Sequence, residues 1–237
     1  RLGPVQAPGG IPLEVDDRLL DIIGGAGERV AHHLHLPLQS GTDSVLRRMR
    51  RPYTAAEYLE VAGGIRRRFP EAAIGADVIV GFPGETEEEF CETCRFVESS
   101  PLTHLHVFAY SDRPGTAASA MTDKVHPDVI TARSLRLRAL GHTLTERFHG
   151  RLEGSSQLAL ILRERTPAGR LQGLTGNYVE VALDGDDDLL NTFQYGRVRG
   201  CADDGRLGFE LEAGTATGRR GAADAEPAAA QAAGEPR

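Results

Sequence analysis

The chain has 237 residues, of which 40% are hydrophobic, which is enough for one large domain or for a domain with a smaller companion. No apolar run approaches the roughly 20 residues of a membrane-spanning helix, and the first residues, Arg1 to Pro4, lack the apolar stretch that is typical of a signal peptide. Three cysteines (Cys91, Cys94 and Cys201) suggest no disulfide framework, which predicts a cytoplasmic protein. The net charge of −7 argues against nonspecific coating of nucleic acid, although arginines cluster at 47–51 and 66–68.

The N-terminal segment predicts a loop, a strand and three helices. Residues 1–12 carry Gly, Pro and Gln without a pattern and are expected to form the loop. Over residues 34–41 leucines alternate with polar residues, which is typical of a strand that has one apolar face. Helices are expected at 15–24, 42–50 and 54–69, and the last begins with a Thr-Ala-Ala-Glu capping box.

A β-branched run over residues 73–81 predicts the central strand. Alternation places Asp77, Ile79 and Gly81 on one face, and the glycine would let a bound molecule approach the backbone. A Pro-Gly turn and a Thr-x-x-Glu capping box then begin a helix over 86–99. A strand over 104–110 follows, again with one polar face.

Strands that alternate with helix-length connections are typical of parallel βα units, so the fold class is predicted as α/β. In such folds the ligand site lies at the C-terminal ends of the strands. Residues 127–150 predict a long connecting helix, and residues 213–237 are expected to be disordered. Short strands between these segments predict a small antiparallel barrel or sandwich; they are expected at 158–162, 171–174, 178–183, 197–198 and 207–211.

Three motifs in order resemble the radical S-adenosylmethionine tRNA methylthiotransferases. They are HLHLPLQSGTD at 33–43, GADVIVGFPGET at 75–86 and YSDRPGT at 110–116. The resemblance implies the second half of a radical SAM partial (β/α) barrel at 1–150, followed by a small all-β TRAM barrel that binds RNA at 151–212. It also implies methylthiolation of carbon 2 of N6-threonylcarbamoyladenosine beside the tRNA anticodon, with the isopentenyladenosine branch as the close alternative.

Members of this family use S-adenosyl-L-methionine and two 4Fe-4S clusters, one of them held by a Cys-x3-Cys-x2-Cys loop. This sequence lacks that loop and begins with Arg1 instead of Met. We therefore expect the C-terminal part of such an enzyme, inactive by itself, with the cluster ligands outside this chain. No catalytic residue and no metal ligand is predicted within it.

The resemblance implies a cofactor-binding set of Gln39, Ser40, Asp77, Ile79 and Gly81. Gln39 and Ser40 would contact the ribose or the methionyl group, and the strand from Asp77 to Gly81 would contact the adenosine. The structural alternative is that Gln39 and Ser40 only cap the next helix, and that the strand is only a core strand.

Three residues are predicted to bind substrate RNA: Arg113, Asn177 and Tyr178. Arg113 could instead pin its own loop. Asn177 could be a turn residue and Tyr178 a core residue, rather than a hydrogen-bonding group and a stacking surface.

The strands on either side of residues 73–81 carry histidines that are predicted to face inward: His35, His104 and His106. A structural role, with their hydrogen bonds satisfied inside the barrel, is favoured over contacts to cofactor or RNA. Cys91 and Cys94 lie three apart within one predicted helix and are interpreted as incidental. The expected partners are tRNA and S-adenosylmethionine, with no membrane, and the protein is expected to be a monomer. Two alternatives have a different function: a truncated RNA-binding module, and a radical enzyme that acts on a ribosomal protein.

Overall fold

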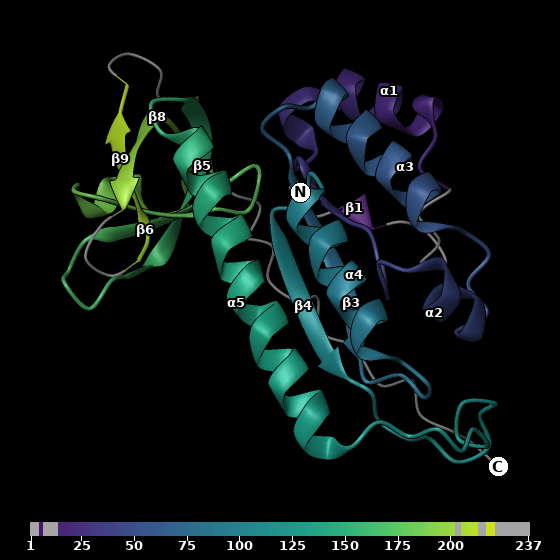
Figure 1. The fold of residues 1–237 in the computed structure, drawn as a ribbon. Helices are drawn as coiled ribbons and strands as arrows, with labels where there is room; N and C mark the ends of the chain where they lie inside the picture. The colour runs from purple at the N-terminus through teal and green to yellow at the C-terminus, as the bar shows by residue number, and fades with distance from the viewer. Residues whose placement is uncertain (1–4, 7–13, 202–204, 213–216, 221–237) are drawn as a thin grey trace, which may run out of the picture.

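The computed structural model describes residues 5–6, 14–201, 205–212 and 217–220. A helix-covered parallel sheet and a small β-barrel are joined by the long helix α5 (Pro127–Leu152), which runs beside β4 (His104–Ala109) toward the barrel (Figure 1). No helix in these ranges is both long enough and apolar enough to span a membrane.

The sheet has the strand order β1-β2-β3-β4, and every neighbouring pair is parallel. The other strands are β1 (Val5–Gln6), β2 (His33–His35) and β3 (Ala73–Val80). The helices that connect them are α1 (Asp17–Ala26), the 3₁₀ helix η3 (Gly27–Arg29), α2 (Asp43–Arg48), α3 (Ala55–Arg68) and α4 (Glu87–Ser99). The predicted α/β organisation is confirmed, with one more parallel strand than expected.

That additional strand corrects the loop predicted at residues 1–12. Val5 pairs with Leu34 and Gln6 pairs with His35, and the rest of the predicted loop lies outside the described residues. The sequence did not reveal this strand because its hydrogen bonds come from β2, far along the chain, and a short run has no pattern of its own.

The strand predicted over 34–41 is interrupted. Strand β2 ends at His35, Pro37 has no N–H to donate to a ladder, and Gln39 regains only a single parallel bridge to Val78. Gln39 adopts a φ of +68°, a left-handed conformation that few residues other than glycine favour. The alternation nevertheless holds, because Leu34, Leu36 and Leu38 are all fully buried.

The core of the first part lies between the outer face of the sheet and the helices. It combines alternate strand residues with the apolar stripes of α3 and α4, including Ile74, Ala76, Val78, Val80, Tyr58, Ile65, Phe90 and Val97. Both predicted capping boxes form, Thr54 with Glu57 and Thr86 with Glu89. The inner face of the sheet is thus left for polar residues.

The second part is an all-β barrel that is closed by the pairing of β8 with β9. Its elements are β5 (Ser156–Arg165), β6 (Leu171–Thr175), β7 (Glu180–Leu183), the 3₁₀ helix η4 (Asp187–Leu189), β8 (Thr192–Cys201), β9 (Leu207–Leu211) and β10 (Thr217–Arg220). Adjacent strands are antiparallel except β7 and β9, which are parallel. The pairing of β10 with β8 contradicts the disorder predicted at 217–220; 213–216 and 221–237 lie outside the described residues.

Helix α5 contributes to both cores. Leu137 and Leu144 pack with the sheet and its helices, whereas Phe148 and Leu152 pack with the interior of the barrel. Ala73, the first residue of β3, also joins the barrel cluster. The two parts are therefore packed against each other.

Candidate functional site

The inner face of the sheet carries a row of imidazoles and one carboxylate. His33 and His35 come from β2, Asp77 from β3, and His104 and His106 from β4. The register places Gly75 between His35 and His104, and pairs Asp77 with His106. The alternation predicted from the sequence therefore brings five titratable groups from three strands onto one surface.

The inner end of this row is half-buried. The two Nε2 atoms of His33 and His104 lie 3.3 Å apart, and Thr103 Oγ1 lies 3.0 Å from Nδ1 of His104. Burial, followed by the proximity of His33 and the other histidines, lowers the pKa of His104 to about 4. Gly75 makes room for this ring, because a Cβ atom there would lie 2.2 Å from His104 Nε2.

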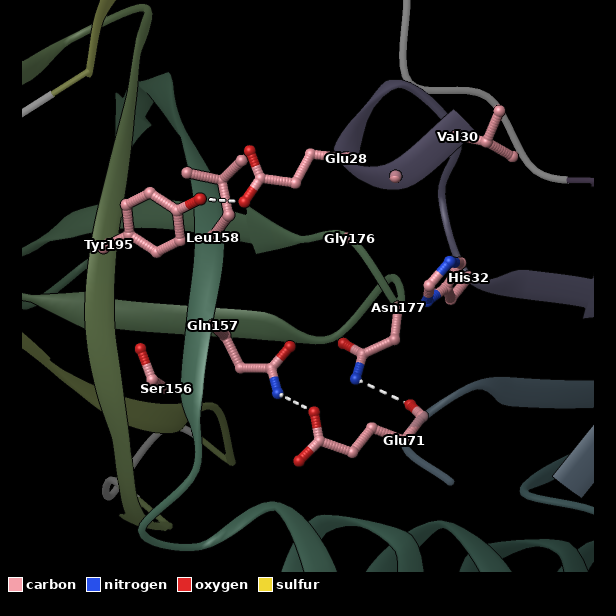
Figure 2. Close-up of a pocket in the computed structure, with 11 residues that line it drawn as sticks. Glu28, Val30, His32, Glu71, Ser156, Gln157, Leu158, Gly176, Asn177 and Tyr195 are labelled. Carbon is pink, nitrogen blue, oxygen red and sulfur yellow. Dashed lines mark hydrogen bonds between the residues drawn. The ribbon is translucent and has the colours of Figure 1, made fainter. Parts of the chain in front are cut away.

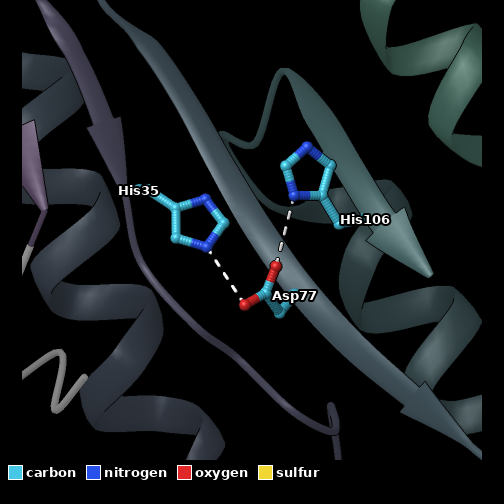
Figure 3. Close-up of side chains that lie close together, drawn as sticks. All are labelled: His35, Asp77 and His106. Atoms are coloured by element: carbon cyan, nitrogen blue, oxygen red, sulfur yellow. Dashed lines mark ion pairs between the residues drawn. The ribbon is translucent and has the colours of Figure 1, made fainter. Parts of the chain in front are cut away.

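The outer end of the row is a His-Asp-His set. His35 Nε2 lies 3.1 Å from Asp77 Oδ2, and His106 Nδ1 lies 3.4 Å from Asp77 Oδ1. Figure 3 shows the two imidazoles approaching the carboxylate from the strands on either side. The family resemblance implies a cofactor contact for Asp77 and does not group it with these histidines. The strand alternation does contain this information, because His35, Asp77 and His106 fall on the same face of adjacent predicted strands.

Farther toward the C-terminal ends of the strands the same face becomes apolar. Ile79 is half-buried and lies opposite Phe108, whose surface is 51% exposed. A large exposed aromatic ring beside polar groups is a combination suited to a flat ring system such as adenine.

Gln39 and Ser40 are both buried, but in different surroundings. The backbone of Gln39 bridges β3 through hydrogen bonds with Asp77 and Ile79, beside the predicted cofactor strand. The Ser40 side chain is completely buried, and its hydroxyl lies 3.3 Å from the hydroxyls of Thr42 and Thr93. Through these contacts Ser40 ties the start of α2 to α4.

Gly81 faces α5 instead of an open ligand surface. A Cβ atom at Gly81 would lie 2.4 Å from Ile130 Cγ1, and the φ of Gly81 is +76°. Its N–H donates to Glu85 Oε2 at 2.7 Å, and Glu85 forms a buried ion pair with Arg133 at 2.9 Å. Close approach explains this glycine, but the approaching group is the Ile130 side chain, whereas the sequence predicts a bound molecule there.

Arg113 lies exposed in the loop after β4, at the end of the sheet where a ligand is expected. Its carbonyl accepts from the backbone N–H and the hydroxyl of Thr116 and so pins the turn. The guanidinium therefore remains a candidate for RNA contact.

Asn177 and Tyr178 hold the barrel onto the first part. Asn177 is buried, and its Nδ2 donates to the carbonyl of Glu71 at 3.0 Å. Tyr178, with a φ of +63°, stacks on His33 with ring centroids 4.8 Å apart. Both side chains are therefore used at the junction, a role that the sequence analysis did not consider.

A partly open cavity of about 270 Å³ lies at the junction. Figure 2 shows Gln157 and Asn177 both directed at Glu71, with Tyr195 bonded to Glu28 across the gap. Gln157 Nε2 donates to the Glu71 carboxylate at 2.7 Å. The polar groups of this cavity are largely committed to one another, which favours a structural role.

The cysteines do not fit an iron–sulfur cluster. Cys91 and Cys94 lie on α4, and Cys201 lies at the end of β8 in the barrel. No group of three thiols converges among the described residues, which include every cysteine of the sequence.

Two of the clustered arginines are occupied by structural contacts. Arg48 binds both carboxylate oxygens of Glu89 and the carbonyl of Gly84. Arg66 donates to three backbone carbonyls, and burial lowers its pKa to about 10. Neither cluster is thus a simple exposed basic patch.

The chain is similar to known proteins over much of its length. Residues 6–97 match the radical SAM superfamily. The chain is 36% identical over 181 residues to the threonylcarbamoyladenosine tRNA methylthiotransferase MtaB of Bacillus subtilis, which covers 75% of this chain and 40% of that protein. It is 43% identical over 182 residues to the tRNA-2-methylthio-N(6)-dimethylallyladenosine synthase of Pelobacter propionicus, which covers 77% of this chain and 41% of that protein.

Over the matched residues the chain is thus similar to tRNA methylthiotransferases and to the radical SAM superfamily. A further relative, from Aquifex aeolicus, carries the same name as the Bacillus protein and is 40% identical over 172 residues, covering 73% of this chain and 40% of its own length. The chain therefore spans about two fifths of the length of these methylthiotransferases.

Proposed function

We propose that this chain is part of an enzyme that methylthiolates carbon 2 of N6-threonylcarbamoyladenosine next to the anticodon of tRNA. The observation that carries the proposal is its 36% identity to the Bacillus threonylcarbamoyladenosine enzyme over 181 residues, which is 75% of this chain. The dimethylallyladenosine substrate is the second candidate, because relatives that bear that name reach 43% and 49% identity.

The inner face provides groups that fit part of S-adenosylmethionine. Ile79 and Phe108 form an apolar ledge for the adenine ring, and Asp77 lies beside them to accept from hydroxyl or amino groups. When bound, the cofactor would supply both the radical and the methyl group. In this proposal the chain's own residues orient the adenosine and keep water from the apolar ledge.

The iron–sulfur clusters belong to the proposal only for the whole protein, because the three cysteines here do not converge. We further propose that the barrel closed by β8 and β9 is a TRAM domain that contributes to tRNA binding, and that the protein is a cytoplasmic monomer. The closed ring of short strands supports the barrel assignment.

The test is mass spectrometry of tRNA nucleosides from a strain that lacks the gene. Loss of the 2-methylthio form of threonylcarbamoyladenosine supports the main proposal, and loss of the dimethylallyl counterpart supports the second candidate. If both nucleosides persist, the enzymatic function is wrong. In that case, tRNA retention by the purified protein on a filter would favour the RNA-binding module.

Complementation with variants tests the inner face. Phe108→Ala should reduce the modified nucleoside at least ~10-fold, because it removes a base-stacking surface worth roughly 1–3 kcal/mol. Leu135→Ala is the matched control, since Leu135 is 65% exposed on α5, away from this face. Equal modification by both variants would contradict the proposed site.

A further inference from the structure

We propose that His35, Asp77 and His106 form a binding site for one divalent transition-metal ion. These three residues come from β2, β3 and β4. Each offers one ligand atom, and the three atoms all lie within 4.8 Å of one another. The sequence by itself predicts no metal ligand in this chain.

The donor set has the right chemistry. Two imidazole nitrogens and one carboxylate are ligands that Zn²⁺, Fe²⁺ and Co²⁺ accept together, and a two-histidine, one-carboxylate set leaves further positions open. Two ligands about 2.1 Å from one ion lie roughly 3 Å apart. The contacts of Asp77 with His35 at 3.1 Å and with His106 at 3.4 Å are close to that spacing.

The supporting structure is rigid and accessible. Each ligand lies on a strand of a continuous parallel ladder, where backbone hydrogen bonds fix its position. The His106 side chain is 57% exposed, so an ion and its remaining water or substrate ligands can reach the open side. Figure 3 shows the three side chains converging in front of β3.

The Asp77 carboxylate supplies a negative charge that balances part of the charge of a bound cation. The ring of His104, the preceding histidine on the same face of β4, lies 5.7 Å from that of His106 and outside the set.

The competing interpretation is that Asp77 merely accepts hydrogen bonds from two histidines and holds them in place. That arrangement would retain no ion after purification and would show no saturable metal binding. The proposal does not depend on methylthiolation, because the measurement below uses binding alone and needs no tRNA, S-adenosylmethionine or iron–sulfur cluster.

The experiment titrates the chelator-treated chain with Zn²⁺ and with Co²⁺ by isothermal titration calorimetry at neutral pH. We expect one ion per chain and a Co²⁺ absorption spectrum typical of nitrogen and oxygen ligands. His35→Ala, Asp77→Asn and His106→Ala should each weaken binding by more than the roughly 10- to 100-fold that loss of an outer-sphere partner costs. His142→Ala, an exposed histidine on α5, is the matched control and should bind like the parent.

Three results would overturn the site: no saturable binding by the parent chain, unchanged affinity in all three ligand variants, or an equal loss in His142→Ala. Loss of binding in His33→Phe with normal affinity in the ligand variants would place the ion at the His33 and His104 pair instead. Thermal unfolding without metal checks that each variant folds. Asp77→Asn keeps the side-chain shape, so the test stands even if a histidine variant unfolds.

Discussion

At the scale of single residues, Glu89 shows one carboxylate serving two parts of the structure. It completes the capping box of α4 with Thr86, and its two oxygens accept from Arg48 at 3.0 and 2.6 Å. Burial raises the pKa of Glu89, but the hydrogen bonds from Arg48, Ser44 and the Thr86 backbone outweigh it and lower the pKa to about 2. The capping role could be read from the sequence, whereas the pairing with Arg48 could not.

This pKa sets an acid dependence of stability. Because the folded-state pKa lies below the unfolded value near 4.5, the carboxylate stabilises the fold above pH 4.5, and this contribution is lost as the pH falls toward 2. Glu89→Gln should cost about 1.5–3 kcal/mol at neutral pH and flatten the acid limb of the stability curve. Urea unfolding across this pH range measures it.

Glu92→Gln is the control for that prediction, since Glu92 is exposed on the same helix. It should leave both the stability and its acid dependence nearly unchanged. If the stability of Glu89→Gln falls with decreasing pH as steeply as that of the parent, other carboxylates cause the acid dependence.

At the scale of elements, α5 is fixed to the turn between β3 and α4 by a buried ion pair. Arg133 and Glu85 have side chains that are 6% and 1% exposed, and Arg133 also reaches the exposed Glu87. Burial raises the pKa of Glu85, and the Gly81 N–H and Arg133 act against that rise. The sequence predicted the helix and the turn but gave no sign that these two residues meet.

Removing one partner of this pair should be costly. Arg133→Ala leaves the Glu85 carboxylate buried without its cation, so we expect a loss of about 3–5 kcal/mol in the free energy of unfolding. Arg147→Ala on the same helix is the control; its contact with Glu98 is exposed and 4.0 Å long, so it should cost at most ~1 kcal/mol. Similar losses in both variants by urea unfolding would contradict the buried-pair account.

At the scale of the whole molecule, the junction holds the barrel in place beside the sheet. Glu71 accepts from Gln157 through its carboxylate and from Asn177 through its carbonyl, and Tyr178 stacks on His33. Phe148 and Leu152 continue α5 into the barrel core. The two parts should therefore unfold as one cooperative unit.

Loosening the junction should separate the two parts. The double variant Gln157→Ala with Asn177→Ala removes the two hydrogen bonds to Glu71, worth roughly 1 kcal/mol each, and differential scanning calorimetry should then resolve two transitions in place of one. Gln172→Ala, in β6 of the same barrel, is the control and should keep a single transition. A single transition in the double variant would mean that α5 alone couples the two parts.

The sequence by itself determined the parallel βα units, the capping boxes and which residues of each strand share a face, because these features depend on neighbours within a few residues. Asp77 could thus be placed on an inner face with Ile79 from the alternation alone. Only the tertiary structure decided the strand register, which set Asp77 between His35 and His106 and put Ile130 against Gly81. It also assigned Asn177 and Tyr178 to the junction, because contacts between distant segments depend on how the whole chain packs.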